Sequence, residues 1–158
     1  MIMTNLSISF RDANIEDIPT IVQFLADDPL GSKRERYEIP LPESYLKAFS
    51  AICDDPNNEL IVAAKWNKIL GFLQITFIPN LSYQGGWRAL IEGVRVKKEY
   101  RNQGIGRRIF EWAIERAKER GCHLIQLTTD KKRPAAIKFY ESLGFQATHE
   151  GMKLHLGN

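Results

Sequence analysis

One segment in the second half of the chain constrains the fold more than any other. A run typical of a β-strand ends at Val96, a short basic loop follows, and Gly104 and Gly106 then open an amphipathic pattern over residues 105–120. Glycines let the backbone approach a ligand closely, because no Cβ is in the way. The first amides of a helix lack intrahelical acceptors and lie at the positive end of the dipole, so they bind phosphates well. The chain must therefore deliver a strand to the start of a helix, with an anion site at the junction.

Hydrophobic periodicity and turn residues predict the remaining elements. We expect helices at residues 15–25, 43–52, 105–120 and 134–143, with a loop or broken helix at 30–42 and a Gly-rich loop at 80–87. We expect strands at residues 6–11, 60–65, 69–78, 88–96 and 123–128, and a closing pair at 145–147 and 152–156. This order predicts an α/β or α+β fold of three layers, a mixed and mostly antiparallel sheet with helices on both faces.

Length and composition bound the class of protein. The chain of 158 residues predicts a single domain spanning 1–158, large enough to fold without a disulfide or metal. It has no apolar run long enough to span a bilayer, and its first ten residues lack the basic and apolar regions of a secretory signal. We therefore expect a cytoplasmic protein that does not engage membranes. The cysteines and histidines lack metal-ligand spacing, so we expect no metal.

The charge distribution points to a small polyanion. The net charge of +3 is too mild to predict nucleic-acid binding. The basic residues nevertheless form two clusters, which are either solvated loops or a local site for a polyanionic small molecule. The clusters are Arg95, Lys97, Lys98, Arg101, Arg107 and Arg108, with the single acid Glu99 among them, and Lys131, Lys132 and Arg133.

Two motifs identify the phosphate ligand by resemblance. The third glycine of a dinucleotide motif is missing, because Ile109 stands in its place, and no Walker loop is present. The pattern is instead Arg101-x-x-Gly104-x-Gly106, and Ala136-x-x-x-Tyr140-x-x-x-Gly144-Phe145 follows about thirty residues later. Together these motifs resemble those of the GNAT superfamily of acyl-CoA N-acyltransferases, and the element order fits over nearly the whole chain.

The resemblance implies acetyl-CoA as the acyl donor and assigns residues to it. In this family the amides of the first motif hold the pyrophosphate, and the preceding strand pairs with the pantetheine arm. That strand typically bulges, which predicts a bulge at Gly93, and splays from the next strand. Many members carry Asn where this chain has Arg133, which could instead reach a phosphate. The residues assigned to the coenzyme are Val94, Arg95, Val96, Arg101, Asn102, Gln103, Gly104, Ile105, Gly106, Arg107 and Arg133.

Two residues are predicted to be catalytic. In simple alternation Glu92 shares an apolar strand face with Leu90, Val94 and Val96, and family members often place an acid here, so we predict that Glu92 accepts the amine proton. The alternative is that Glu92 only pairs with a neighbouring arginine, Arg88 or Arg95. Tyr140 matches the tyrosine that lies near the thioester sulfur in many members, and its alternative role is packing in the helix face.

The predicted function is therefore an N-acetyltransferase that moves an acetyl group from acetyl-CoA to a primary amine by direct attack in a ternary complex. The expected partner is a small-molecule or peptide amine, with no nucleic acid, and a homodimer is among the assembly states that the sequence leaves open. Two alternatives from other classes are a CoA-binding sensor without turnover and a basic nucleic-acid-binding protein. The acceptor itself is not predicted, because acceptor loops in one fold vary.

Overall fold

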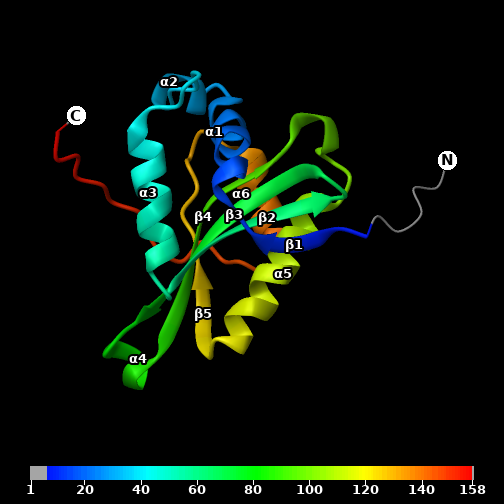
Figure 1. Cartoon of the computed structure of the whole chain (residues 1–158). Helices are drawn as coiled ribbons and strands as arrows, with labels where there is room; N and C mark the ends of the chain where they lie inside the picture. The colour runs from blue at the N-terminus through cyan, green and yellow to red at the C-terminus, as the bar shows by residue number, and fades with distance from the viewer. Residues whose placement is uncertain (1–6, 158) are drawn as a thin grey trace. The chain divides into compact units, whose positions relative to one another are not determined.

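The computed structural model describes residues 7–157, and the chain divides into two compact units, Met1–Gln126 and Leu127–Asn158. The first unit contains the sheet, and the second contains one helix followed by extended chain (Figure 1). The single-domain organisation inferred from length stays a prediction.

A five-stranded sheet organises the first unit, with its strands in the order β1-β2-β3-β4-β5 (Figure 1). The first three pairings are antiparallel, and β4 pairs with β5 in parallel across α5. The strands are β1 (Ser9–Asp12), β2 (Asn58–Lys65), β3 (Lys68–Pro79), β4 (Trp87–Val96) and β5 (Cys122–Gln126). The mixed, mostly antiparallel sheet is therefore confirmed. The predicted start of the first strand at position 6 lies outside the described residues.

Helices cover both faces of this sheet, as the periodicity predicts. In Figure 1, α1 and α3 lie on one side of the strands and α5 lies on the other. The segment at 30–42 contains only one short helical turn, and the loop at 80–87 contains a turn in which Tyr83 and Gln84 have positive φ. The helical elements are η1 (Ile15–Asp17), α1 (Ile18–Ala26), α2 (Gly31–Arg34), α3 (Glu43–Asp54), α4 (Ser82–Gly85), η2 (Lys98–Tyr100) and α5 (Ile105–Glu119).

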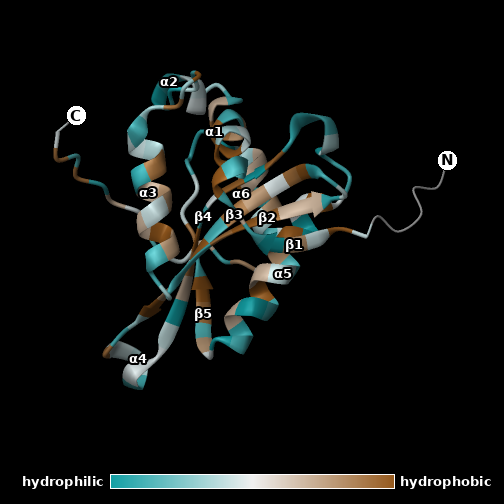
Figure 2. Cartoon of the chain, viewed as in Figure 1, coloured by the Kyte–Doolittle hydropathy of each residue, from teal (hydrophilic) through white to brown (hydrophobic). Residues whose placement is uncertain are grey.

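Two apolar layers hold the first unit together. On the α1 side, Val62 and Phe72 pack with apolar residues of α1, including Val22. On the α5 side, Phe77 of β3 is 1% exposed, and Phe110 of α5 is buried to the same degree. Figure 2 shows apolar stretches along the central strands and mixed colours along α5, as expected for an amphipathic helix. Burial of these side chains is the main favourable term for folding.

A capping box fixes the entry into η1 and α1. The Asn14 side chain accepts a hydrogen bond from the Glu16 amide, and the Asp17 carboxylate accepts one from the Asn14 amide at 2.8 Å. Arg11 of β1 donates to both Asp17 oxygens, at 2.7 and 3.1 Å. Burial alone raises the pKa of the Asp17 carboxyl, but its hydrogen bonds to Arg11 and Asn14 outweigh that effect and leave the pKa below its ordinary value.

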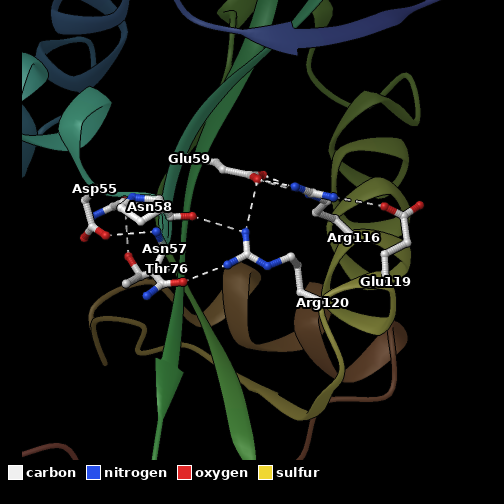
Figure 3. A network of polar contacts seen from close by, with 9 residues as sticks. Asp55, Asn57, Asn58, Glu59, Thr76, Arg116, Glu119 and Arg120 are labelled. Atoms are coloured by element: carbon white, nitrogen blue, oxygen red, sulfur yellow. Dashed lines mark hydrogen bonds and ion pairs between the residues drawn. The ribbon is translucent and has the colours of Figure 1, made fainter.

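A polar network ties the start of β2 to the end of α5 (Figure 3). Arg116 Nε donates to both Glu59 oxygens at 3.1 Å, and Arg120 pairs with the same carboxylate at 3.7 Å. The Arg120 guanidinium also lies 4.1 Å from the centre of the Phe77 ring. Hydrogen bonding to Glu59 raises the pKa of Arg116. The network therefore fixes the far end of α5 against the sheet, opposite the end at which the glycines begin the helix.

The second unit contains α6 (Pro134–Ser142) and no strand among its described residues. The predicted closing strands at 145–147 and 152–156 are therefore wrong. Met152, Leu154 and Leu156 alternate as a strand would, yet they are 93%, 86% and 92% exposed. Alternation orders side chains on two faces, but it supplies no partner for the backbone groups, and a strand needs one.

No helix in the described part of the chain combines the length and the apolar character needed to cross a bilayer.

Candidate active site

A β-bulge interrupts β4 at the position where the sequence predicts one. Glu92 lies opposite Gln74 and Arg95 lies opposite Phe72, so two residues of β4 face the single residue between these pairs on β3. Gly93 adopts φ +66°, a left-handed conformation that glycine accepts without the usual steric cost. The predicted bulge at Gly93 is confirmed.

The bulge reverses the alternation of side chains between the two sheet faces, on which the predicted apolar surroundings of Glu92 depended. Beyond it, Arg95 rather than Val96 lies on the face that carries Glu92, because its partner Phe72 is two residues from Gln74. Val96 lies opposite Gly71, on the other face. The expectation that Glu92 shares an apolar face with Val94 and Val96 is therefore wrong. An extra residue in the strand shifts every later side chain to the opposite side.

Glu92 is exposed and makes no ion pair with any residue that the structure describes. The two arginines that could have neutralised it are engaged elsewhere. Arg95 Nε lies 3.3 Å from Asp28 at the end of α1, and Arg88 Nη1 donates to Gln126 at 3.2 Å. Among the described residues, the structure thus gives no salt bridge between Glu92 and Arg88 or Arg95.

Pairing between β4 and β5 stops early. The last pair of this parallel ladder is Leu90 with Gln126, so the β5-facing edge of β4 over residues 91–96 has no strand partner within the described chain. Unpaired backbone groups on a strand edge are ready to bind an extended ligand. The predicted splay of this strand from the next one agrees with the observed register.

The basic loop that follows is fixed by side chains that bond to backbone carbonyls. Arg101 Nε donates to the Val96 carbonyl at 3.1 Å, and Gln103 Nε2 donates to the Glu99 carbonyl at 3.0 Å. The backbone of Asn102 and Gly104 is left-handed, with φ +61° and +82°. These contacts hold the loop in one shape before any ligand binds.

The amides at the start of α5 form the most distinctive feature of the site. Within the described chain, none of the backbone N–H groups of residues 102–106 donates a hydrogen bond. A Cβ built on Gly104 would meet no atom within 4 Å, so the approach to these amides is open. Ile105 is 2% exposed and anchors the loop in the core, so only its amide faces the site. This arrangement fits a phosphate or pyrophosphate group.

The side chains near this loop divide into two groups. Arg101 and Arg107 are exposed, and their positive charge can attract a polyanion. The Arg95 side chain is only 18% exposed and contacts Asp28 and the Val94 carbonyl. Arg95 and the flanking valines can therefore contribute backbone groups to a coenzyme, whereas the Arg95 guanidinium has a structural role. Sequence reasoning missed Asp28, because only the fold brings α1 to β4.

Two predicted site residues belong to the second unit. The Tyr140 ring is half-buried, with its centre 5.7 Å from that of Phe139 and 6.1 Å from that of Phe145. Arg133 precedes α6, and its amide donates to the Asp130 carbonyl at 2.9 Å. Both residues are thus held by local structure, Tyr140 on α6 and Arg133 directly before it.

Sequence reasoning also missed a row across the sheet face that carries Glu92, in which three of the four side chains are polar. Asn58, Thr76, Leu90 and Gln126 lie side by side across four strands. Asn58 Oδ1 accepts hydrogen bonds from Gln74 at 3.0 Å and Thr76 at 3.3 Å. Isolated polar residues within otherwise apolar strands were the available signal. No cluster of three or more potential metal ligands occurs among the described residues.

The comparisons with known proteins decide the family. The model of the acetyltransferase (GNAT) family matches residues 22–145, which is most of the chain and includes both motifs. The chain belongs to the GNAT family. The fold and motifs inferred from the sequence are therefore confirmed at family level, and the chain is classed with the acyltransferases.

The chain is also similar to individual curated proteins and solved structures. Aminoalkylphosphonate N-acetyltransferase of Salmonella typhimurium is 28% identical over 68% of this chain and 69% of its own length. The structure of a transcriptional regulator from Bacillus halodurans is 61% identical, with a TM-score of 0.92, and covers 94% of this chain and 99% of its own. A putative acetyltransferase from Agrobacterium tumefaciens is 26% identical, with a TM-score of 0.82, at the same coverages of 94% and 99%.

Proposed function

We propose that this GNAT chain transfers an acetyl group from acetyl-CoA to a primary amine of a small molecule or peptide, by direct attack within a ternary complex. The observation that carries the proposal is the run of unbonded amides at residues 102–106, open to solvent at Gly104. Acetyl-CoA supplies the acetyl group as a thioester. Its pyrophosphate matches these amides, and the basic side chains of Arg101 and Arg107 match its charge.

The strand before the loop is assigned to the pantetheine arm. Residues 91–96 of β4 have backbone groups without a strand partner, and an extended amide-containing chain can pair with them. We assign Val94 and Val96 to this contact through their backbones, together with the Arg95 backbone. Arg133 is assigned to a phosphate of the coenzyme, because its planar guanidinium suits phosphate oxygens.

Glu92 is assigned the role of base. A lysine-like amine has a pKa of about 10.4, so producing its neutral form at pH 7 costs roughly 4.6 kcal/mol. A nearby carboxylate, acting directly or through water, lowers that cost by accepting the proton. Glu92 suits this role because it is exposed and makes no ion pair among the described residues. Tyr140 is assigned to hydrogen-bond the departing sulfur through its hydroxyl.

One relative supports a small amine as acceptor. The Salmonella typhimurium relative, by its name, acetylates aminoalkylphosphonates, which are small amines with an acidic group. A second candidate function, a coenzyme A-binding regulator without turnover, is favoured by the description of the Bacillus halodurans protein as a transcriptional regulator. Both candidates require coenzyme binding, and only the first requires catalysis.

Thermal unfolding tests coenzyme binding. Acetyl-CoA should raise the Tm of the wild-type chain, because a ligand at about a hundred times its Kd stabilises by roughly 2.7 kcal/mol. Gly104→Val should remove most of this shift by blocking the approach to the amides. Gly121→Val is the matched control, because Gly121 also has positive φ (+72°) and open space around it but lies at the other end of α5. An unchanged Tm at millimolar acetyl-CoA would refute both candidates.

Turnover separates the two candidates. A panel of primary amines assayed for release of free coenzyme A should show acceptor-dependent release, with the acetylated amine as product. Binding without acceptor-dependent release, together with salt-sensitive binding to DNA, would favour the regulator instead.

A further inference from the structure

A positive charge that pairs with no described carboxylate lies on β4, four residues before the proposed base. Arg88 of β4 donates from Nη1 to the Gln126 side chain at 3.2 Å, and its Nε is buried without a hydrogen-bond acceptor in the described chain. No carboxylate described by the structure forms an ion pair with it. Six other arginines do pair with an acid: Arg11, Arg34, Arg36, Arg95, Arg116 and Arg120.

This arrangement is costly unless an anion completes it. Gln126 offers a neutral dipole, which satisfies one N–H group but does not compensate the charge. Removing an ionised group from water without a counter-charge costs free energy, so partly buried charges are normally paired. A guanidinium is also a planar fork whose N–H groups match the two oxygens of a carboxylate or a phosphate-like group.

The position of Arg88 connects it to the acceptor. Arg88 and Glu92 are four residues apart on β4, with Leu90 between them on the same sheet face, so about 13 Å of strand separates their α-carbons. Between these two positions, Leu90 is flanked on the same face by Thr76 of β3 and Gln126 of β5. The face thus presents a cation at one end, Leu90 between the polar side chains of Thr76 and Gln126 in the middle, and an exposed acid at the other end.

We propose that Arg88 binds an anionic group of the acceptor, so that the acceptor class is a small amine bearing a carboxylate, phosphonate or phosphate. The acid of the acceptor pairs with the Arg88 guanidinium, and its amine points toward Glu92. Arg88 determines specificity and does not touch the reacting atoms. This inference rests on the proposed acetyl transfer for its substrate, but the anion site can be tested without turnover.

Matched acceptor pairs test the proposal in the wild-type chain. The pairs are 2-aminoethylphosphonate with ethanolamine, and β-alanine with β-alaninamide, which differ mainly in the acidic group. The acidic member of at least one pair should have the higher kcat/KM, by about tenfold or more, as expected for charge-assisted hydrogen bonds. The pair with the larger ratio identifies phosphonate or carboxylate as the preferred group. Equal values within both pairs would overturn the proposal.

Variants locate the preference at Arg88. Arg88→Gln should lower kcat/KM for the acidic amine by about tenfold or more and leave its neutral partner within about twofold. Arg88→Lys should retain part of the preference, because the charge remains while the fork is lost. Lys68→Gln, an exposed cation in the β2–β3 hairpin, is the control and should change neither value. An equal loss for both members of a pair would mean that Arg88 is structural.

A binding measurement separates failure of this inference from failure of the proposed function. With coenzyme A saturating, 2-aminoethylphosphonate or β-alanine should raise the Tm of the wild-type chain and of Lys68→Gln, but not that of Arg88→Gln. If the wild type acetylates no amine, the proposed function fails, and this Tm shift still decides whether Arg88 binds anions. If acetylation occurs without any Arg88-dependent shift or preference, only the inference fails.

Discussion

Glu92 lies opposite Gln74 in the β3–β4 ladder, and the next pair along the same strands is Arg95 with Phe72. Between these two pairs, β4 advances by three residues and β3 by two. The extra residue places Arg95 on the sheet face that α1 covers, where Asp28 neutralises it, whereas Glu92, before the bulge, is exposed and makes no ion pair among the described residues. The bulge therefore gives Arg95 its structural partner, Asp28, and so keeps the Arg95 charge from pairing with Glu92.

Alanine at position 93 tests whether the bulge shapes the coenzyme site. Gly93 has φ +66°, so a Cβ there is strained, and Gly93→Ala should destabilise the chain by about 1–2 kcal/mol. Because the bulge also sets the positions of Val94 and Val96, the variant should bind acetyl-CoA several-fold more weakly. Urea unfolding and calorimetric titration measure the two effects.

Gly121→Ala is the control for this strain. Gly121 has φ +72° at the end of α5, so the variant should lose similar stability but bind acetyl-CoA as the wild type does. Equal affinities for the two variants would show that the bulge does not contribute to binding.

Replacing Glu92 by Gln tests the proposed base through its pH dependence. At pH 7 the amine is protonated and needs a base, so kcat/KM should fall by about 10²-fold or more. Near pH 10 much of the amine is already neutral, and the loss should be smaller. Glu115→Gln, an exposed acid on α5, should leave the profile unchanged. A loss that is the same at both pH values would assign Glu92 a structural role.

Asp17 should make stability depend on pH in the acid range. Its pKa in the folded chain lies below the ordinary value, because hydrogen bonds to Arg11 and Asn14 outweigh desolvation. Its contribution is therefore complete above about pH 4 and is lost as the pH falls through the lowered pKa. Asp17→Asn should cost about 1–2 kcal/mol at pH 7 and much less near pH 2.

Urea unfolding at the two pH values measures this dependence on Asp17. Asp54→Asn, at an exposed position, should have little effect at either pH. A cost of Asp17→Asn that does not change between pH 7 and pH 2 would contradict the assignment.

Local patterns predicted most of this fold because the signals are strong and short-ranged. The capping residue Asn14 and the glycines around α5 mark helix ends, and the predicted long helix at 105–120 matches Ile105–Glu119 within one residue. The predicted bulge at Gly93 was also correct, since glycine within a strand often marks one.

The features that sequence could not supply depend on distant partners. The sheet face on which Val96 lies depends on the register between β4 and β3. Alternation along β4 alone does not reveal that register. The Arg95–Asp28 ion pair joins residues that are far apart in sequence. Residues 152–156 have the pattern of a strand, but a pattern cannot show whether a neighbouring strand is available.

Removing the Tyr140 hydroxyl tests the other proposed catalytic group. Phe in its place keeps a ring beside Phe139 and Phe145, so the stability of Tyr140→Phe should stay close to that of the wild type. A free thiol has a pKa near 8.5 and a free phenol near 10, so full proton transfer to the sulfur would be uphill by about 2 kcal/mol. We therefore expect the hydroxyl to act mainly by hydrogen bonding.

With acetyl-CoA saturating, kcat of Tyr140→Phe should fall by about 10²-fold while the Kd for acetyl-CoA changes little. Turnover at the wild-type rate would make Tyr140 a packing residue and leave the departing thiolate to solvent or to another group.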